Sequence, residues 1–328
     1  MIPLLETQIS LLRSAFPELV EHEQMARHTS FRTGGAARLY GVFSNPSRVI
    51  ELVEAAESAQ IPWSIYGGGS NLLVADEGYE GVLIQMANRG LEIQDTTVRV
   101  ESGMITALLA RKTVEAGLTG LEWSIGVPGT VGGALYGNAG CYGGETKDYL
   151  QSVDVYDVAR KERRSIPAAE CAYGYRESRF KKERFIIFGA TFVLTKSPDP
   201  VASRERLEQI MRERKEKQPL DQSSAGCAFK NVEFADDAQV ALLEREVTIP
   251  ESMRAHHILG AGWLVDQAGL LGARVGEVEV SQKHGNFLVN KGHARAQDVV
   301  SLISLIKRKV RDEFGIELQE EVQYLGFS

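Results

Sequence analysis

The chain has 328 residues with 43% hydrophobic and 25% charged side chains, the composition of a soluble protein large enough for two or three domains. Its formal net charge of −7 argues against a nucleic-acid partner, which would favour a basic surface. No apolar run reaches membrane-spanning length and the first residues lack the layout of a signal peptide, so we expect neither a membrane partner nor export.

The cysteine and histidine content indicates the cellular location and bears on the presence of a metal site. The three cysteines, Cys141, Cys171 and Cys227, are odd in number and show no CxxC spacing. This usage fits a reducing cytoplasm and provides neither a disulfide framework nor a zinc motif. The six histidines are scattered, so we expect no metal site and a cytoplasmic location.

The first quarter of the chain predicts a peripheral helix followed by a small βαββ unit. Apolar residues at mixed helical spacing within the first 25 residues indicate the peripheral helix. A second helix is expected from Ser44-Asn45-Pro46, with proline in its first turn and Val49 and Val53 on one apolar face. Strands expected at 61–66, 72–75 and 82–86 complete the unit.

A glycine-rich loop joins the first two of these strands. The stretch Tyr66-Gly67-Gly68-Gly69-Ser70-Asn71-Leu72 returns to a strand, so it matches neither the Walker lysine loop nor the strand-to-helix dinucleotide fingerprint. Three consecutive glycines leave the backbone N–H groups open to phosphate oxygens, and Ser70 and Asn71 add side-chain hydrogen bonds. We expect the loop to bind a pyrophosphate; a purely structural turn is the alternative.

A second glycine cluster follows strands expected near 91–93 and 98–100 and a helix from about 104 to 116. It covers residues 126–144 with eight glycines in nineteen positions, a density that marks backbone lying against a ligand or another backbone. Together the two clusters resemble the vanillyl-alcohol-oxidase (PCMH) type of FAD-binding domain, in which one loop wraps the pyrophosphate and the other packs along the dinucleotide. The resemblance implies cofactor contacts at Tyr66, Gly67, Gly68, Gly69, Ser70, Asn71, Leu72, Gly126, Pro128, Gly129, Thr130, Gly132, Gly133, Asn138 and Gly140.

The second half of the chain alternates strands with two long helices. Strands are expected within 151–195, and the charged stretch 204–217 predicts a solvated helix at a linker near 200–220. A helix from about 297 to 314 has a continuous apolar face, and Gly315 ends it. The segment Trp263–Gly269 predicts a helix that packs the domain after the linker. The fold class is therefore α+β.

Three further segments look unlike ordinary packing: Tyr173-Gly174-Tyr175-Arg176-Glu177-Ser178-Arg179-Phe180, Ala225-Gly226-Cys227-Ala228-Phe229-Lys230-Asn231 and Leu318-Gln319-Glu320-Glu321-Val322 up to Gly326. Taken singly, Arg176 could form a surface ion pair, Cys227 could be a buried small hydrophobe and Glu321 an edge-strand charge. In their order along the chain, with the glycine clusters, the motifs resemble the UDP-N-acetylenolpyruvoylglucosamine reductase family from about His28 to Gly326. Members of that family make UDP-N-acetylmuramate for peptidoglycan.

The resemblance implies the chemistry and the residues that perform it. NADPH reduces FAD, and the hydride then reaches C3 of an enolpyruvyl UDP-sugar, so charge develops at C2. Cys227 matches the proton donor, and Arg176 and Glu321 match residues near the substrate carboxylate. Substrate contacts are implied at Tyr175, Arg176, Lys217, Lys230, Asn231 and His284; for His284 a purely structural role is the alternative.

Two departures from the family pattern stand out. The family's proton donor is usually serine, and a thiol is the stronger acid, so Cys227 preserves the role in principle but adds sensitivity to oxidation. Only fifty residues separate Arg176 from Cys227, which leaves no room for the tyrosine-bearing lid of one branch. We therefore expect the shorter branch without the lid.

The resemblance also implies a domain plan. Residues 1–88, with 319–328 returning to them, would form FAD-binding subdomain 1, residues 89–200 subdomain 2, and residues 201–318 the substrate-binding domain. No His or Cys lies between His28 and Cys141, which argues for non-covalent FAD. We expect a monomer or a weak oligomer. The alternatives are another FAD-dependent oxidoreductase of the same fold and a nucleotide-sugar binding protein without flavin.

Overall fold

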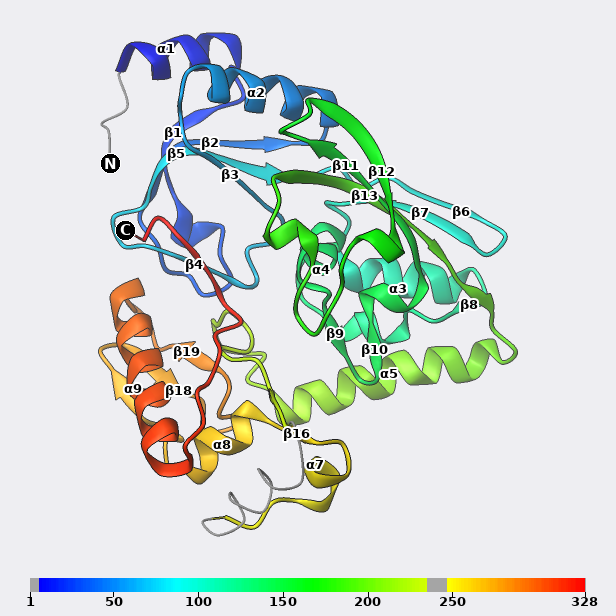
Figure 1. Ribbon diagram of the computed structural model, residues 1–328, viewed down its shortest axis with the longest axis vertical. Helices are drawn as coiled ribbons and strands as arrows, with labels where there is room; N and C mark the ends of the chain where they lie inside the picture. The colour runs from blue at the N-terminus through cyan, green and yellow to red at the C-terminus, as the bar shows by residue number, and fades with distance from the viewer. Residues whose placement is uncertain (1–5, 235–246, 328) are drawn as a thin grey trace. The chain divides into compact units, whose positions relative to one another are not determined.

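The computed structural model describes residues 6–234 and 247–327 (Figure 1). The chain divides into two compact units, each built from separated segments. The first unit takes Met1–Glu23, Ala36–Gly69 and Tyr79–Arg214, and the second takes Gln24–Gly35, Ser70–Gly78 and Lys215–Ser328. The division falls within the glycine loop: Gly69 belongs to the first unit and Ser70 to the second.

The first sheet of the first unit has four strands in the order β1-β2-β5-β3. These are β1 (Val20–Gln24), β2 (Ala36–Phe43), β5 (Tyr79–Met86) and β3 (Trp63–Tyr66). Both β2 and β3 run parallel to β5. Helices α1 (Glu6–Ala15) and α2 (Pro46–Ser58) bury apolar faces in the same cluster as β2 and β5. The Asn45 side chain caps α2 by accepting a hydrogen bond from Ser47 N at 2.9 Å, as the sequence pattern predicted for this helix start.

One expectation for this region is wrong. The strand at 72–74 forms, but β4 (Leu72–Val74) pairs in parallel with β20 (Gln323–Leu325) and does not join the sheet of β3 and β5. The local apolar pattern predicts that a strand exists, whereas its partner lies some 250 residues further along the chain, beyond the reach of local pattern.

The second sheet of the first unit has five antiparallel strands in the order β12-β11-β13-β7-β6. Its strands are β6 (Leu91–Gln94), β7 (Thr97–Glu101), β11 (Leu150–Asp157), β12 (Glu162–Pro167) and β13 (Phe185–Val193). Helices α3 (Thr106–Glu115) and α4 (Val131–Gly137) contribute Leu109, Val131 and Leu135 to the apolar cluster of this sheet. Two separate two-stranded sheets and four 3₁₀ turns complete the described part of the first unit. They are β8 (Leu118–Thr119) with β14 (Thr195–Lys196), β9 (Gly140–Cys141) with β10 (Gly144–Glu145), η2 (Glu122–Gly126), η3 (Thr146–Tyr149), η4 (Ala168–Glu170) and η5 (Arg179–Lys181).

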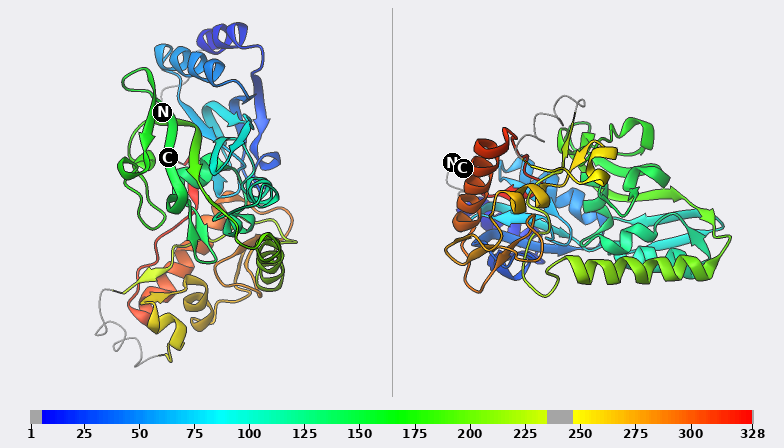
Figure 2. Two further views of the ribbon diagram at one scale, coloured as in Figure 1. Left: turned by 90° about the vertical axis from the view of Figure 1, so that its right-hand side faces the viewer. Right: turned by 90° about the horizontal axis from the view of Figure 1, so that it is seen from below.

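The charged stretch forms one long helix, α5 (Pro200–Lys217), seen at full length in the right view of Figure 2. Only Ser203 and Ile210 are buried, in keeping with the expected solvated helix. It belongs to the first unit up to Arg214 and to the second from Lys215.

The second unit is built around helix α9 (Ala296–Phe314), whose apolar face packs on small sheets (Figure 1). Gly315 ends α9 with a φ of +67°, a left-handed conformation that favours glycine. The other elements are η1 (Met25–Arg27), β15 (Val232–Glu233), α7 (Glu251–Ala255), β16 (Ile258–Leu259), α8 (Ala261–Gln267), β17 (Arg274–Val275), β18 (Val278–Val280) and β19 (Leu288–Asn290). Helix α8 confirms the helix expected from Trp263, and Leu264 and Val265 are fully buried in the core of this unit.

Among the helices of the described residues, none combines the length and the apolar character that a membrane crossing needs.

Candidate active site

The structure brings parts of the two glycine clusters together within the first unit. A Cβ added to Gly67 would lie 2.1 Å from Oγ1 of Thr130, and one added to Gly68 would lie 3.0 Å from Cα of Gly129. The backbone of the first loop therefore lies directly on the start of α4, a contact that only glycine allows. The absence of a side chain at Gly67 and Gly68 thus allows the two clusters to pack closely, and the contact of these residues with the pyrophosphate of FAD stays a prediction.

Side chains behind the loop fix its position. Gln85 donates from Nε2 to the carbonyl oxygen of Gly67 at 3.3 Å, and its Oε1 accepts from the Tyr40 hydroxyl at 2.5 Å. Burial raises the pKa of Tyr66 well above its ordinary value, so this phenol stays neutral beside the loop. Gln85 was not among the residues predicted from sequence, since a strand glutamine carries no motif of its own.

Other members of the second cluster face protein. A Cβ on Gly126 would lie 3.2 Å from Sγ of Cys141, one on Gly132 would lie 2.9 Å from Cβ of Ser102, and one on Gly140 would lie 2.7 Å from the Gly144 carbonyl oxygen. These glycines allow close packing inside the first unit. Their cofactor contacts stay a prediction, as do those of Pro128 and Gly133.

Asn138 holds the turn that carries Arg176. It caps α4 in a left-handed conformation and is fully buried, with its amide donating to Glu145 Oε2 at 3.1 Å and to the Gly174 carbonyl oxygen at 2.9 Å. Gly174 and Glu177 exchange backbone hydrogen bonds at 3.1 and 3.2 Å, which closes the turn. The Asn138 side chain thus contributes to the position of the predicted catalytic arginine.

Arg176 sits at the tip of this turn with a φ of +54°. Its Nη2 donates to the Gly140 carbonyl oxygen at 2.7 Å, and its guanidinium carbon lies 5.0 Å from the centre of the Tyr175 ring. A guanidinium stays charged at any physiological pH, so this group offers a fixed positive charge.

The second unit holds Cys227 and Glu321 on neighbouring extended segments. Segment 227–230 forms isolated bridges on both sides: Cys227 pairs with Phe287, and Phe229 pairs with Glu320. Glu321 N donates to the Ala228 carbonyl oxygen at 2.8 Å, and Lys230 N donates to that of Gln319 at 2.8 Å. We call this row of hydrogen-bonded segments (286–287, 227–230 and 319–321) the catalytic ladder, after the roles predicted for Cys227 and Glu321.

Asn71 is hydrogen-bonded to the 319–321 segment of the catalytic ladder and to Gln323, just beyond that segment. Its Nδ2 donates to the carbonyl oxygen of Glu321 at 3.0 Å, and its own carbonyl oxygen accepts from Gln323 N at 2.9 Å. The predicted cofactor residue Asn71 thus holds the backbone of a predicted catalytic residue, while its contact with the cofactor stays a prediction.

His284 lies beside the catalytic ladder and is half-buried. Its Nδ1 accepts from Asn286 N at 3.2 Å, so the neutral ring carries its hydrogen on Nε2. Burial lowers the pKa of His284 below its ordinary value of 6.5. Its ring lies against Gly262 of α8, where an added Cβ would lie 2.9 Å from Cε1. The residue can therefore donate one hydrogen bond from Nε2 without being charged.

The remaining predicted substrate residues also lie in the second unit. Oδ1 of Asn231 accepts from Ala261 N at 3.1 Å, which joins the end of segment 227–231 to the start of α8. Lys217 is the last residue of α5, and Lys230 lies in the catalytic ladder.

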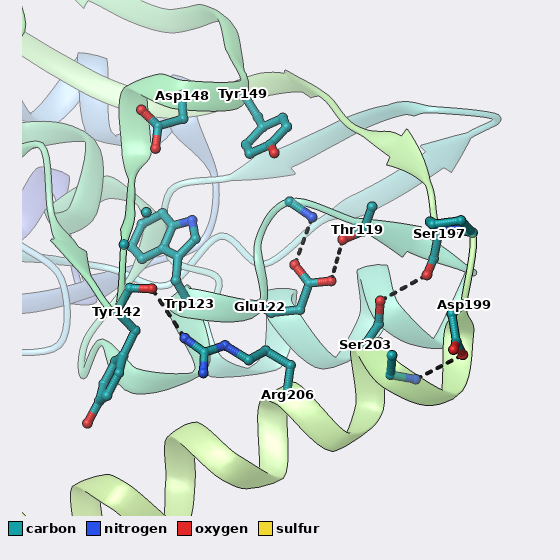
Figure 3. A pocket seen from close by; sticks show the side chains of 15 residues that line it. Thr119, Glu122, Trp123, Tyr142, Asp148, Tyr149, Ser197, Asp199, Ser203 and Arg206 are labelled. Atoms are coloured by element: carbon teal, nitrogen blue, oxygen red, sulfur yellow. Dashed lines mark hydrogen bonds between the residues drawn. The ribbon is translucent and has the colours of Figure 1, made fainter.

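A cavity of about 720 Å³ in the first unit lies elsewhere (Figure 3). It is lined by Thr119, Gly120, Glu122, Trp123, Tyr142, Gly143, Gly144, Asp148, Tyr149, Ser197, Pro198, Asp199, Ala202, Ser203 and Arg206. Several of its polar groups are bonded to one another: Glu122 accepts from Thr119 Oγ1 and Gly120 N, and the Ser197 and Ser203 hydroxyls are hydrogen-bonded, whereas Nε1 of Trp123 is buried without a hydrogen-bond partner among the described residues. None of the predicted site residues lines it, so we assign the reaction elsewhere.

The fold and the paired glycine elements define the chain as a flavin-dependent oxidoreductase of the vanillyl-alcohol-oxidase type. Residues 38–162 match the model of an FAD binding domain. A UDP-N-acetylenolpyruvoylglucosamine reductase from Chloroflexus aurantiacus is 38% identical over 316 residues, 94% of this chain and 97% of the relative. One from Caldicellulosiruptor bescii is 34% identical over 96% of this chain and 93% of the relative. The chain belongs to the UDP-N-acetylenolpyruvoylglucosamine reductase family.

Two further comparisons agree. Residues 218–325 match the model of the C-terminal domain of UDP-N-acetylenolpyruvoylglucosamine reductase. The crystal structure of the enzyme from Thermus caldophilus is similar with a TM-score of 0.71 and 31% identity, covering 94% of this chain and 98% of that one. The family and the fold class predicted from the sequence are confirmed; the assignment to the branch without the tyrosine lid stays a prediction.

Proposed function

We propose that this protein catalyses the NADPH-dependent, FAD-mediated reduction of UDP-N-acetylglucosamine enolpyruvate to UDP-N-acetylmuramate, a step of peptidoglycan synthesis. One observation carries the proposal: in the family's C-terminal domain, a thiol and a carboxylate, Cys227 and Glu321, lie on adjacent segments of one hydrogen-bonded ladder. An acid and a polarising group are the two functions that reduction of an enol ether requires from the protein.

FAD supplies the chemistry of hydride transfer, taking a hydride from NADPH and giving it to C3 of the enolpyruvyl group. Gly67 and Gly68 of the first loop, with Gly129 and Thr130 at the start of α4, would hold its pyrophosphate. The glycine density of the two clusters and their close packing on one another support this assignment. We propose that the cofactor is bound without a covalent link.

Cys227 would supply the proton. When the C3–H bond forms, the electron pair of the C2=C3 double bond moves to C2 and is delocalised into the carboxylate. The thiol of Cys227 then gives its proton to C2, and the resulting thiolate regains a proton from solvent. The hydride and the thiol proton account for both hydrogens added to the double bond, so the step needs no further co-reactant. The thiol must be protonated before each turnover.

Arg176 would stabilise the negative charge that develops at C2, and Glu321 would lie near the substrate carboxylate. The guanidinium of Arg176 is held by the Gly140 carbonyl oxygen and offers a fixed cation for the substrate carboxylate. The backbone of Glu321 is held by its N–H, which donates to the Ala228 carbonyl oxygen, and by its carbonyl oxygen, which accepts from the Asn71 side chain. These bonds fix the backbone position that carries the Glu321 side chain. Preorganised groups of this kind cost no reorganisation during the reaction.

The UDP-sugar would contact Tyr175, Lys217, Lys230, Asn231 and His284. Lysine side chains provide point charges for a diphosphate, and Asn231 and the Nε2–H of His284 provide hydrogen bonds to sugar or uracil edges. Residues 1–88 with 319–328 and residues 89–200 would then form the FAD-binding subdomains, and 201–318 the substrate-binding domain. We propose a cytoplasmic enzyme that works as a monomer or a weak oligomer.

A flavin spectrum of the purified protein tests the function. Under anaerobic conditions NADPH should bleach the flavin absorbance, and the enolpyruvyl UDP-sugar should restore it with formation of UDP-N-acetylmuramate. UDP-N-acetylglucosamine, which lacks the double bond, is the matched control and should leave the flavin reduced. A protein without flavin, or a reduced flavin that the enolpyruvyl substrate does not reoxidise, would contradict the proposal. Acid precipitation should release the flavin into the supernatant.

A further inference from the structure

Asn286 lies in segment 286–287 of the catalytic ladder and is only 3% exposed. Its Oδ1 accepts from Phe229 N at 2.9 Å and its Nδ2 donates to the Phe229 carbonyl oxygen at 2.8 Å. Its backbone carbonyl oxygen accepts from Ala228 N at 2.8 Å. One residue therefore binds segment 227–230 through both its side chain and its main chain.

We propose that Asn286 is a positioning residue for the proton donor Cys227. This inference rests on the proposed function and assigns no direct contact between Asn286 and the substrate. Segment 227–230 belongs to no continuous strand: it is connected by the isolated bridges at Cys227 and Phe229. The Asn286 amide binds both polar groups of the Phe229 backbone and so contributes to the register of the segment.

The chemistry of the side chain explains why an amide is needed. A carboxamide has a donor and an acceptor side by side and can bind the N–H and the C=O of one extended residue at the same time. No aliphatic side chain of this size can do so. With Asn286 removed, the buried N–H and C=O of Phe229 would lose their partners and the segment would shift to find others.

The residue before the proton donor makes the position more sensitive. Gly226 has a φ of +75°, in the left-handed region that favours glycine, so the chain turns sharply just before Cys227. The position of the thiol then depends on the anchor that follows it, at 228–229. A misplacement of about 1 Å can cost about 10²-fold in rate when it affects a reacting group.

Proton transfer to C2 also has a stereochemical consequence. Reduction turns C2 of the enolpyruvyl group into a stereocentre, whose configuration is decided by the face from which the proton arrives. A thiol held in place gives one configuration. If the thiol is displaced, water can deliver the proton to either face.

The variant Asn286→Ala tests the inference, with Asn290→Ala as matched control. Asn290 lies four residues further on and also binds backbone with both ends of its amide, donating to Phe31 O at 3.0 Å and accepting from Gly292 N at 2.8 Å. Reduction of the flavin by NADPH and its reoxidation by the enolpyruvyl UDP-sugar are measured separately by anaerobic stopped flow. The configuration at C2 of the product is read after a reaction in D₂O, and alkylation of Cys227 by iodoacetamide is followed by peptide mass mapping.

For Asn286→Ala we expect reduction by NADPH within about threefold of the parent and reoxidation slower by about 10²-fold. The product should contain both configurations at C2, and the alkylation rate of Cys227 should change, whereas Asn290→Ala matches the parent in all four measurements. If Asn286→Ala does not fold, Asn286→Asp keeps the acceptor for Phe229 N but loses the donor, and should show the same changes.

An Asn286 variant with normal reoxidation and a single C2 configuration would overturn the inference. Equal slowing of both half-reactions, with unchanged configuration, would also overturn it, because that is the signature of a general structural role. A parent enzyme that does not reduce the enolpyruvyl UDP-sugar at all would instead refute the proposed function.

Discussion

The contact between the glycine loop and the start of α4 leads to a sharp prediction for Gly67→Ala. The new Cβ would lie 2.1 Å from Thr130 Oγ1, more than 1 Å closer than an ordinary contact of about 3.5 Å. Gly67 does not have a positive φ, so alanine is compatible with its backbone and the overlap is the main perturbation. Either the loop moves away from α4, or the Thr130 side chain rotates and gives up its hydrogen bond from Gly133 N.

The size of the effect follows from these two routes. Loss of a threonine N-cap costs about 1 kcal/mol, and forced overpacking typically costs about 1–3 kcal/mol. If this free energy falls on the FAD-bound state, affinity for FAD drops by about 5- to 150-fold. The assay is titration of the apoprotein with FAD, followed by quenching of flavin fluorescence, together with thermal unfolding of the apoprotein to confirm that it folds.

Two companion variants separate the clash from other causes. Thr130→Ala removes Oγ1 and leaves its Cβ at 3.2 Å from the new methyl group, so the double variant should bind FAD within about threefold of Thr130→Ala alone. Gly137→Ala is the control, because no heavy atom lies within 4 Å of its added Cβ and it sits in α4; its FAD affinity should be unchanged. A Gly67→Ala variant with parental affinity for FAD would refute the role of the glycine loop in binding FAD. Weak binding that Thr130→Ala does not relieve would refute the clash with Thr130.

Three further predictions concern the reaction and its pH dependence. Cys227→Ser should retain substantial turnover and resist mild peroxide, whereas Cys227→Ala should lose about 10²- to 10⁴-fold in flavin reoxidation; parental turnover of the alanine variant would make Cys227 a packing residue. Arg176→Ala and Glu321→Gln should both reduce flavin with NADPH at useful rates yet reoxidise it slowly with the UDP-sugar in stopped flow, and a loss confined to reduction would reverse the assignment. Burial holds the pKa of His284 below 6.5. At acidic pH the imidazole is therefore protonated to a greater extent in the unfolded chain than in the folded chain. Its contribution to stability is therefore present above pH 6.5 and lost as pH falls through the folded pKa, and His284→Asn should reduce the fall in urea midpoint between about pH 7.5 and 5.5; an equal fall in both proteins would count against the shift.

The local sequence pattern was sufficient to predict those helices and loops whose formation depends on residues close together in sequence. Pro46 after Asn45, the apolar face of residues 296–314 and the terminating Gly315 predict their helices, because caps and helical periodicity act within a few residues. The same holds for the glycine loop. Its composition alone shows that backbone there meets something closely, and the ordered motifs identify the family.

Only the tertiary structure showed which distant segments pair with one another. The strand at 72–74 pairs with residues 323–325. The carbonyl oxygen of Ala228, next to Cys227, accepts from Glu321 N across nearly a hundred positions of sequence, a hydrogen bond that no local signal encodes. Asn286 illustrates the physical reason. A buried amide is informative only once its donor and acceptor are seen to meet the N–H and C=O of Phe229, and such a match is a property of two segments brought together by the fold, whereas residue type and spacing belong to the sequence itself.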